Sequence, residues 1–464
     1  MKLGKVRRVH FIGIGGSGMS GIDEVLLNLG YKISGSDQAP SDSTRRLTRL
    51  GARVRIGHEA AAVGGADVVV VSSAVAADNP ERVEAQRQRI PVIPRAEMLG
   101  ELMRLKYGVA VAGSHGKTST TSMIATLLSR CGLDPTAVIG GRLGVLGSNA
   151  KLGSGHLMIA EADESDGSFL KLYPSLAIVT GVDHEHLENF GGKYETLLEA
   201  FLRFLGRVPF YGAVVACADD AGVQRLLPQV PRRILTYGLQ PGADYTAVEI
   251  QPDGFSVGYT LQRSGEAITR VRLMTPGRHQ VQNSLAALAV ADELGLSLRV
   301  AAAALEEFHG ADRRMQRKGE SRGVLVVDDY GHHPREIAAT LLALREAVGS
   351  RRIVVLFQPH RFTRLAALMR DFAACFERAD ALVLSDVYAA HEAPIPGVDA
   401  ATLASMVRQH GPANVVHAGS LEQATQHLIQ ILERGDVALT LGAGSVGKTG
   451  DTILAALGRM KEPA

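Results

Sequence analysis

Two glycine loops that carry a lysine give this chain the residues to bind a nucleotide phosphate. Residues 442–449, GAGSVGKT, fit the pattern of Gly, any four residues, Gly-Lys-Thr. Residues 113–118, GSHGKT, miss this pattern because Val111 stands where the first glycine belongs. Each loop follows a predicted strand and precedes a predicted helix, where backbone N–H groups and the lysine can bind phosphate oxygens. Other residues must therefore decide which loop binds the nucleotide.

The residues that follow each loop favour the central one. Phosphoryl transfer needs Mg²⁺, which a loop hydroxyl and a strand-end carboxylate can hold. Thr118 lies on the central loop, Glu161 ends the next predicted strand, and His186 lies in the turn after a further strand. Such turns meet at one edge of a parallel sheet. Only one helix's length of chain follows the 442–449 loop, so we predict that Lys117 binds ATP and that the tail loop is a closing turn or a cradle for another anion.

Carboxylates and histidines are dense in two of these turns. The stretch EADESD, residues 161–166, has four carboxylates, which often mark only a solvated turn. Because it follows the buried strand HLMIA, we predict that it binds metal, with Glu161 as the first ligand. The stretch VDHEHLENF, residues 182–190, could bind zinc, but no third His or Cys stands at ligand spacing. A magnesium-linked site that uses His186 fits better, and His184 is interpreted as a polar turn residue.

A third glycine turn, GIGGSG at residues 13–18, also connects a predicted strand to a predicted helix. Glycines let the backbone approach a diphosphate, and the helix N-terminus supplies N–H donors. Asp37 ends the next predicted strand, where a ribose-binding carboxylate is expected. A plain tight turn is the alternative. The motif does not specify NAD, since any ligand with a diphosphate and a ribose fits, including a UDP-sugar.

The composition bounds the class of protein. The 464 residues are 46% hydrophobic and 21% charged, with a net charge of +2, so neither nucleic acid nor an anionic membrane is expected as the main partner. Cys131, Cys217 and Cys375 are scattered, which indicates a reducing cytosol. The apolar stretch VHFIGI runs straight into glycines and is a strand rather than a signal peptide. No apolar run of about 18 residues is present, so we expect a cytoplasmic protein.

Alternating predicted strands and helices indicate an α/β protein with parallel sheets in three domains. Residues 1–107 form a Rossmann-like domain and residues 108–311 a central P-loop-type ATPase domain, with a β-rich stretch at about 232–275. Residues 312–464 form a second parallel, Rossmann-like domain. Its predicted strands end in the polar stretches DDYGHHP and QPHRFTR, where arginines could bind a carboxylate or phosphate.

The chain resembles the Mur ligase family over essentially its whole length. The motifs that carry the resemblance are HFIGIGGSGMSGI, ISGSD, PRAEMLGELMR, GSHGKTSTT, EADESDGSFL, PFYG, GRHQVQNSLAAL, DDYGHHPREI, QPHRFTR and APIPGVD. The resemblance implies an N-terminal domain for a UDP-sugar, a central domain for ATP and a C-terminal domain for an amino acid. It further implies an ATP- and Mg²⁺-dependent ligase that joins L-alanine to the carboxylate of UDP-N-acetylmuramate through an acyl phosphate, in peptidoglycan precursor synthesis. An alternative is the family member that joins a preformed tripeptide to the same sugar nucleotide.

The resemblance also implies roles for individual residues. The catalytic group is Lys117, Glu161 and His186, and the metal ligands are Thr118, Glu161 and His186. The ATP-binding residues are Gly113, Ser114, His115, Gly116, Lys117, Thr118, Ser119, Asn283, Arg314 and Asp329. The residues that bind the UDP-sugar are Gly15, Gly16, Ser17, Asp37, Ser72 and Ser73, and those that bind the amino acid are Arg361 and Arg364.

Departures from the family pattern are small. Ser114 and Ser119 replace threonines and conserve the hydroxyl, whereas Gln280 replaces an asparagine near the expected adenine contact. In the family the tail loop is a glycine turn of the amino-acid domain, which supports the central loop as the ATP site. A monomer or weak homodimer is expected. Two other classes, an NAD-type oxidoreductase and a nonenzymatic nucleotide-binding subunit, leave GSHGKT or the metal-site carboxylates without a role.

Overall fold

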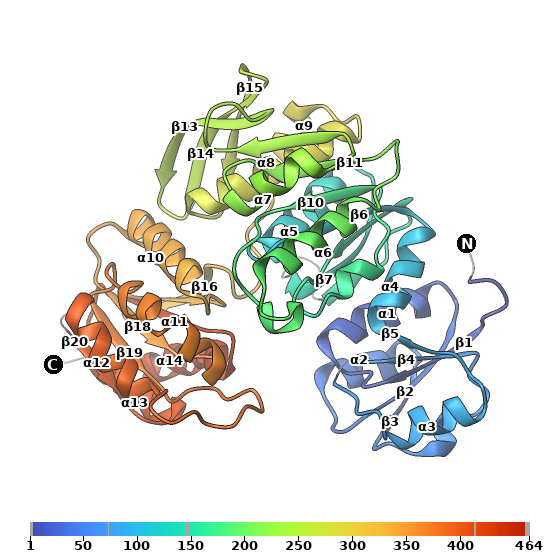
Figure 1. Ribbon diagram of the computed structural model, residues 1–464. Coiled ribbons are helices and arrows are strands. Elements are labelled where there is room, and N and C mark those ends of the chain that lie inside the picture. Colours follow the sequence, from blue (N-terminus) through green and yellow to red (C-terminus); the bar gives the residue numbers. More distant parts are fainter. Residues whose placement is uncertain (1–2, 73, 144–147, 413, 460–464) are drawn as a thin grey trace. The chain divides into compact units, whose positions relative to one another are not determined.

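The computed structural model describes residues 3–72, 74–143, 148–412 and 414–459. The chain divides into two compact units. One unit contains Met1–Glu249, Tyr259–Arg272 and Gln282–Phe308, and the other contains Ile250–Gly258, Leu273–Val281 and His309–Ala464. Strands and helices alternate through most of the chain, which confirms the predicted α/β class, and the ribbon follows this order along its colours (Figure 1).

The N-terminal sheet is parallel, with strands in the order β3-β2-β1-β4-β5. Its strands are β1 (Arg8–Ile12), β2 (Lys32–Asp37), β3 (Arg53–Ile56), β4 (Val68–Val71) and β5 (Val92–Pro94). Its helices are α1 (Ser17–Asn28), α2 (Asp42–Arg49), α3 (Pro80–Arg87) and α4 (Arg95–Arg104). Alternate residues of β1 face opposite sides of the sheet, as in any strand. Val9 and Phe11 pack in the core that contains α1, whereas Ile12 packs in a smaller core with Ala85 of α3.

A buried polar network joins β1, β2 and α3 of this domain. Glu81 of α3 is fully buried, and one of its carboxylate oxygens lies 2.9 Å from His10 Nε2 and accepts a hydrogen bond from Ser36 Oγ at 2.7 Å. The other oxygen accepts from the backbone N–H of Glu59 at 3.1 Å. His10 Nδ1 in turn lies 2.9 Å from Ser34 Oγ. The network satisfies groups that would otherwise be costly to bury.

The central sheet has the strand order β15-β14-β13-β12-β11-β10-β6-β9-β7-β8. Its strands are β6 (Tyr107–Ala112), β7 (Thr136–Leu143), β8 (Ser148–Lys151), β9 (Leu157–Glu161), β10 (Leu176–Val179), β11 (Ala213–Cys217), β12 (Ile234–Gly238), β13 (Tyr245–Asp253), β14 (Ser256–Arg263) and β15 (Glu266–Leu273). Its helices are α5 (Lys117–Arg130), α6 (Tyr194–Leu205), α7 (Ala221–Leu226), α8 (Arg278–Glu293) and α9 (Leu298–Leu305). Strands β12 to β15 confirm the β-rich stretch predicted at about 232–275.

The C-terminal sheet has the strand order β16-β17-β21-β18-β19-β20. Its strands are β16 (Gln316–Ser321), β17 (Val324–Asp329), β18 (Ile353–Phe357), β19 (Ala381–Leu384), β20 (Asn414–His417) and β21 (Val437–Leu441). Helices α10 (Pro334–Val348), α11 (Phe362–Ala374) and α12 (Ala400–His410) cover one face, and α13 (Leu421–Ile431) and α14 (Thr449–Arg459) cover the other.

The C-terminal sheet is parallel, as predicted, except at one edge. Strands β17, β21, β18, β19 and β20 pair in parallel, but β16 pairs with β17 in the antiparallel direction. A short turn joins β16 to β17, and a connection of that length permits only antiparallel pairing. The sequence of β16, QRKGES, lacks the apolar run that marks a buried strand, which explains why the pattern did not reveal it.

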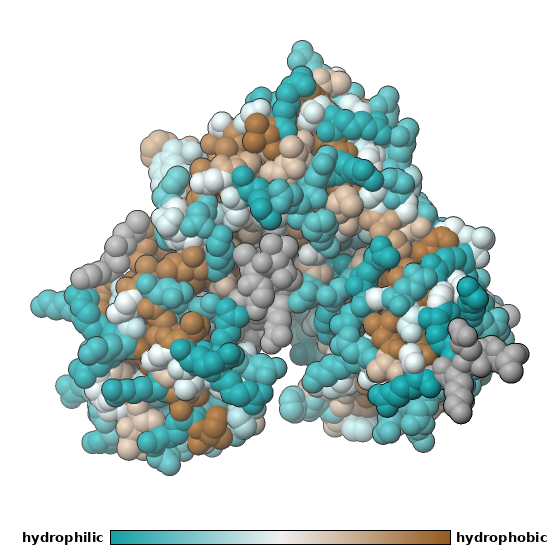
Figure 2. All heavy atoms as spheres, turned by 180° about the vertical axis from the view of Figure 1, so that it is seen from behind, coloured by the Kyte–Doolittle hydropathy of each residue, from teal (hydrophilic) through white to brown (hydrophobic). Residues whose placement is uncertain are grey.

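Short 3₁₀ helices complete the described elements: η1 (Ala60–Val63), η2 (Ser168–Lys171), η3 (Leu187–Phe190), η4 (Leu227–Gln229) and η5 (Ser445–Lys448). In the face that Figure 2 shows, hydrophilic residues cover most of the surface and hydrophobic residues appear between them. Among the described residues, every helix is too short or too polar to cross a bilayer.

Candidate active site

Three neighbouring strands of the central sheet bring the predicted nucleotide and metal residues to one edge. Strand β6 pairs in parallel with β10 on one side and with β9 on the other. At their carboxyl ends, β6 leads into the central loop (residues 113–118), β9 into the acidic turn (residues 161–166) and β10 into the histidine turn (residues 180–188). The loop, the acidic turn and the histidine turn thus follow adjacent strand ends, as predicted from the order of the motifs.

The central loop has a backbone that only glycine fits. Gly113 has a φ of 132°, and a Cβ atom there would lie 2.2 Å from Thr180 Oγ1. Gly116, with a φ of 79°, forms the N-cap of α5, and a Cβ atom there would lie 2.8 Å from Asn283 Oδ1. The loop therefore packs tightly between the end of β10 and the helix α8, and it places the N-terminus of α5 at the edge of the sheet.

Lys117, the first residue of α5, folds back over this loop. Its Nζ atom donates to the carbonyl oxygens of Gly113 at 2.5 Å and Ser114 at 3.3 Å, and it lies 3.0 Å and 2.9 Å from the two carboxylate oxygens of Glu164. Burial alone would lower the pKa of Lys117, but the negative charges of Glu164, Asp163 and Glu161 outweigh it and raise that pKa. The ammonium is thus held charged at the mouth of the loop.

The structure places Glu161 and Thr118 at this same edge. Glu161 ends β9 in register with Val111 of β6, and Thr118 is the second residue of α5. A carboxylate and a hydroxyl are the hard oxygen ligands that Mg²⁺ prefers. Asp163 has a lowered pKa because the cations Lys117 and Arg95 and the hydrogen bonds from Ser165 outweigh its burial, so a further anionic group faces this region. The donor set fits a magnesium ion that also meets phosphate oxygens.

The histidine turn after β10 contributes a second polar group. His115 Nε2 lies 3.5 Å from a carboxylate oxygen of Asp183 and 3.3 Å from one of Glu185. The backbone N–H of Asp183 donates to Ser114 Oγ at 2.8 Å, which ties this turn to the central loop. Its titratable side chains are thereby held beside the loop, where a second cation could bind.

His186 and His184 have different surroundings in the structure. His186 has a left-handed backbone with a φ of 56° at the start of η3, and its ring lies 3.8 Å from Glu185 and from Glu188. His184 instead stacks on the ring of Tyr194, with centroids 3.9 Å apart, and most of its side chain is exposed. His186 is therefore the histidine of this turn that faces carboxylates on both ring nitrogens, whereas His184 packs as a surface residue.

The tail loop has a different structure despite its fit to the phosphate-loop pattern. Its backbone turns through Gly442, with a φ of 136°, and then forms the 3₁₀ helix η5 before α14 begins. The side chain of Gln358 enters the loop, so that a Cβ atom on Gly444 would lie 2.4 Å from Gln358 Oε1. Arg313 Nη2 binds the Gly442 carbonyl oxygen, and Lys448 is exposed. The interior of this loop is filled by protein atoms, as expected for a closing turn.

The glycine turn of the N-terminal domain lies beside the carboxylate predicted for ribose binding. Asp37 Oδ2 accepts a hydrogen bond from the backbone N–H of Gly15 at 2.8 Å. A Cβ atom on Gly13 would lie 3.2 Å from Ser72 Cβ, so Ser72 adjoins the same turn. Gly16 is the N-cap residue of α1. Ser73 and the side chain of Ser17 lie outside the described residues.

The predicted residues of the C-terminal domain separate into two groups. Asp329 is buried at the end of β17, where its carboxylate accepts from the backbone N–H groups of Met315 and Gly331, both at 2.8 Å. Burial raises the pKa of Asp329, although the nearby cation Arg314 opposes this effect. Arg314 lies over the ring of Tyr330, 5.2 Å from its centroid. Asp329 therefore fixes the strand end and orients the segment that carries Arg314.

The second group follows β18. Arg361, the N-cap residue of α11, has a φ of 71°, and its Nε atom lies 3.9 Å from Glu392. Arg364 Nη1 lies 3.3 Å from Nδ1 of His360, whose ring stacks on Tyr388. A non-glycine residue with such a backbone is uncommon and occurs often at functional sites. The two predicted arginines thus share one turn, next to aromatic and imidazole rings.

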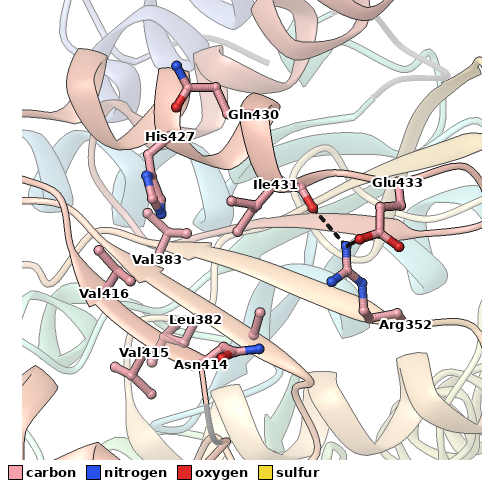
Figure 3. Close-up of a pocket in the computed structure, with 11 residues that line it drawn as sticks. Arg352, Leu382, Val383, Asn414, Val415, Val416, His427, Gln430, Ile431 and Glu433 are labelled. Atoms are coloured by element: carbon pink, nitrogen blue, oxygen red, sulfur yellow. Dashed lines mark hydrogen bonds and ion pairs between the residues drawn. The ribbon is translucent and has the colours of Figure 1, made fainter. Parts of the chain in front are cut away.

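Two pockets of the structure lie at the amino ends of strands, whereas the predicted site residues lie at the carboxyl ends. A pocket of about 520 Å³ lies at the amino ends of β18, β19 and β20, where Arg352 binds the Ile431 carbonyl oxygen and faces Glu433 (Figure 3). A pocket of about 380 Å³ lies at the amino ends of β6, β7 and β9, beside Lys106. Ligands of open α/β sheets bind at the carboxyl ends of the strands, so neither pocket is assigned to the substrates.

Comparisons with known proteins agree with this geometry. Three family models match the chain: "Mur ligase family, catalytic domain" over residues 8–107, "Mur ligase middle domain" over 111–291 and "Mur ligase, glutamate ligase domain" over 313–444. The UDP-N-acetylmuramate–L-alanine ligase of Geobacter sulfurreducens is 52% identical over 454 residues, which cover 98% of each chain. The chain belongs to the Mur ligase family. Its three-domain organisation is that of the family.

Further relatives support the same assignment. The UDP-N-acetylmuramate–L-alanine ligase of Myxococcus xanthus is 53% identical over 96% of this chain and 94% of the relative. The solved structure of UDP-N-acetylmuramate-alanine ligase from Thermotoga maritima matches with a TM-score of 0.80 at 28% identity, over 97% of this Mur ligase and 98% of the other chain. A murein peptide ligase from Psychrobacter arcticus shares the fold, with a TM-score of 0.70 at 23% identity and coverage of 98% and 100%.

One residue of the site was missed from the sequence. Glu164 lies within the acidic stretch 161–166, but the rule that ligands lie at strand ends singled out Glu161 instead. In the structure Glu164 is 2% exposed and forms the ion pair with Lys117. The signal that could have identified Glu164 is the density of carboxylates after the strand, because a carboxylate of such a cluster is buried only beside a cation.

Proposed function

We propose that this Mur ligase joins L-alanine to the carboxylate of UDP-N-acetylmuramate, with conversion of ATP to ADP and phosphate. The observation that carries the proposal is the convergence of Lys117, the acidic turn and the histidine turn on the adjacent strands β10, β6 and β9. Two relatives that are 52% and 53% identical to this chain, and match it over nearly their full length, are named UDP-N-acetylmuramate–L-alanine ligases, which supports the choice of substrates.

The central loop supplies the binding energy for the triphosphate. N–H groups at the N-terminus of α5 and the ammonium of Lys117 meet the β- and γ-phosphate oxygens, whose negative charge grows as the terminal phosphoryl group leaves ADP. A carboxylate oxygen of the sugar nucleotide attacks the γ-phosphorus, and ADP departs. The product is an acyl phosphate, which has a much better leaving group than the carboxylate itself.

In the second step the amine of L-alanine attacks the carbonyl carbon of the acyl phosphate. The C–N bond forms, the C–O bond to phosphate breaks, and the proton that the amine loses leaves with the phosphate as HPO₄²⁻. Thr118, Glu161 and His186 would hold Mg²⁺, which when bound neutralises phosphate charge. The residues of the central loop orient the triphosphate toward the attacking carboxylate, which accelerates the reaction by proximity.

In this proposal the N-terminal and C-terminal domains bind the other two substrates. The turn containing Gly15 and Gly16, with Asp37, binds the UDP part, and Arg361 and Arg364 bind the carboxylate of alanine. Asn283, Arg314 and Asp329 complete the ATP site. The proposed enzyme works in the cytoplasm, where ATP is available, as a monomer or weak homodimer.

The test is a reconstituted reaction with purified protein. Phosphate release should require ATP, Mg²⁺, UDP-N-acetylmuramate and L-alanine together, and omission of any one should abolish it. Mass analysis of a competition among L-alanine, serine, glycine and a murein tripeptide identifies the amine substrate. A product that contains mainly the tripeptide would replace this proposal with the tripeptide ligase activity.

A further inference from the structure

Glu164 forms an ion pair with the lysine of the central loop. An ammonium group has three N–H donors, and those of Lys117 meet the carbonyl oxygens of Gly113 and Ser114 and the carboxylate of Glu164. The contacts to loop carbonyls hold the ammonium over the loop, which is the position from which such a lysine reaches nucleotide phosphates. The remaining contact of Nζ is to Glu164, so a phosphate oxygen that binds Lys117 on this side competes with that carboxylate.

The contact between the two side chains is close and largely buried. Both carboxylate oxygens lie within 3.0 Å of Nζ, and the side chains are 18% exposed for Lys117 and 2% for Glu164. An ion pair with so little water around it is only weakly screened. The carboxylate offers two anionic oxygens side by side, as a phosphoryl group does, which makes it a chemical substitute for such a group at this point.

We propose that Glu164 is a positioning residue that occupies the phosphate position beside Lys117 in the nucleotide-free enzyme and is displaced when the triphosphate binds. The proposal rests on the proposed function in assigning a nucleotide to this loop. It goes further in predicting that part of the binding free energy of the nucleotide is lost in breaking the ion pair between Lys117 and Glu164.

The displaced carboxylate gives the acidic turn a second role. Glu164 lies three residues after Glu161, which ends β9. Gly167, whose backbone N–H donates to the Glu164 carbonyl oxygen at 2.9 Å, has a φ of 71° and closes this turn. The release of Glu164 therefore occurs in the segment that is predicted to bind the metal ion.

The test compares ADP and AMP binding by calorimetry, without divalent cations, for the wild type and Glu164→Gln. Glutamine has the same shape without the charge, so it competes less for Lys117. We expect ADP to bind about tenfold more tightly, equivalent to about 1.4 kcal/mol. AMP lacks the phosphates that meet Lys117, and its affinity should not change. The matched control is Asp166→Asn, which removes one charge from an exposed position of the same turn and should leave ADP affinity unchanged.

A double-mutant cycle separates a direct effect from a general one. In a Lys117→Met background, Glu164→Gln should give no gain in ADP affinity. The proposal is overturned if Glu164→Gln binds ADP no more tightly than the wild type, if Asp166→Asn gives the same gain, or if the gain persists without Lys117. Glu164→Asp, which withdraws the carboxylate by one methylene, provides the same readout if the glutamine variant folds poorly. A wild type that binds no ADP would contradict the proposed function itself.

Discussion

The side-chain oxygen of Gln358 accepts a hydrogen bond from the backbone nitrogen of Val446 at 3.1 Å, inside the tail loop. In a phosphate-binding loop, backbone N–H groups of this kind bind the anion. Here the side-chain oxygen of Gln358, just after β18, takes the place of the anion, and Ser445 Oγ lies 3.4 Å from the same oxygen. The loop with the better fit to the phosphate-loop pattern is thus closed by its own domain.

The first prediction concerns the two loop lysines. Lys448→Ala should leave the rate of phosphate release within about twofold of the wild type, since its side chain is exposed and its loop is filled. Lys117→Ala should lower kcat/KM at least tenfold, roughly 1.4 kcal/mol or more of transition-state stabilisation. Steady-state kinetics of both purified variants provide the measurement. Loss of activity in Lys448→Ala with retention in Lys117→Ala would reverse the assignment of the ATP site.

The second prediction concerns Gly113. Gly113→Ala introduces a Cβ atom 2.2 Å from Thr180 Oγ1 in a backbone with a φ of 132°, so the loop must shift. We expect ADP affinity to fall at least about tenfold, because strain of about 1–3 kcal/mol acts directly on the phosphate loop. Isothermal titration calorimetry measures this effect.

Gly132→Ala is the matched control. Gly132 also has a left-handed backbone, with a φ of 81°, but a Cβ atom there meets nothing within 4 Å. This variant should lose about 1 kcal/mol of stability and bind ADP as the wild type does. Equal loss of ADP binding in both variants would show that backbone strain anywhere around α5, rather than the contact with Thr180, controls the loop.

The third prediction concerns the buried network around Glu81. Glu81→Gln keeps the size of the side chain but leaves buried hydrogen-bonding groups mismatched, and we expect a loss of about 3 kcal/mol in the free energy of unfolding of the N-terminal domain. Urea unfolding measures it. Glu101→Gln, at a side chain that is 45% exposed, is the control and should change stability by less than about 0.5 kcal/mol. A Glu81→Gln variant as stable as this control would contradict the structural role of the network.

The same residue predicts an acid-side dependence of stability. Burial alone would raise the pKa of Glu81, but hydrogen bonds from His10, Ser36 and the Glu59 backbone outweigh it and lower that pKa. A lowered carboxyl pKa stabilises the fold above the ordinary value of 4.5, and this contribution disappears as the pH falls through the folded value. The difference in stability between the wild type and Glu81→Gln should therefore shrink below about pH 4.5.

The fourth prediction concerns His332 of the C-terminal domain. Burial, reinforced by the cations Arg364 and Arg314, lowers the pKa of His332 to about 3, although Glu336 opposes the shift. As the pH falls below about 6.5, His332 binds a proton in the unfolded chain, whereas in the folded chain it stays neutral until the pH approaches about 3. Stability should thus fall as the pH drops from about 6.5 toward about 3.

A variant isolates this contribution. His332→Gln should show a weaker loss of the thermal unfolding midpoint between about pH 7 and pH 5 than the wild type. His391→Gln, at an exposed position, should retain the wild-type slope. If His332→Gln has the same pH slope as the wild type, His332 does not contribute to it.

The sequence predicted the strands and turns at the centre of the central sheet better than the edges of the sheets. Buried parallel strands such as β6 and β10 are continuous apolar runs, and the turns after them carry conspicuous glycines, acids and histidines. Strand β16 could not be predicted in this way, because its polar sequence forms a strand only through pairing with β17. Likewise, the entry of Gln358 into the tail loop depends on the alignment of β18 beside β21, which no local pattern contains.

The hidden pairing of Lys117 with Glu164 has a similar cause. The two residues are separated by 47 positions, and the contact arises because β6 and β9 are neighbours in the sheet although β7 and β8 intervene in the sequence. Sequence spacing revealed that both turns reach the same edge. The choice of Glu164 rather than Glu161 as the lysine's partner depends on the path of a few residues of irregular backbone.

The antiparallel strand β16 has a consequence for association between molecules. Without it, the apolar strand β17 would present unpaired N–H and C=O groups along its length, a template onto which a strand of another copy could add. The strand that covers it carries Arg317, Lys318 and Glu320, and its pairing is irregular between Arg317 and Gly319. Charged side chains and an irregular edge discourage further strand addition, so this border of the sheet is a poor template for pairing with another copy.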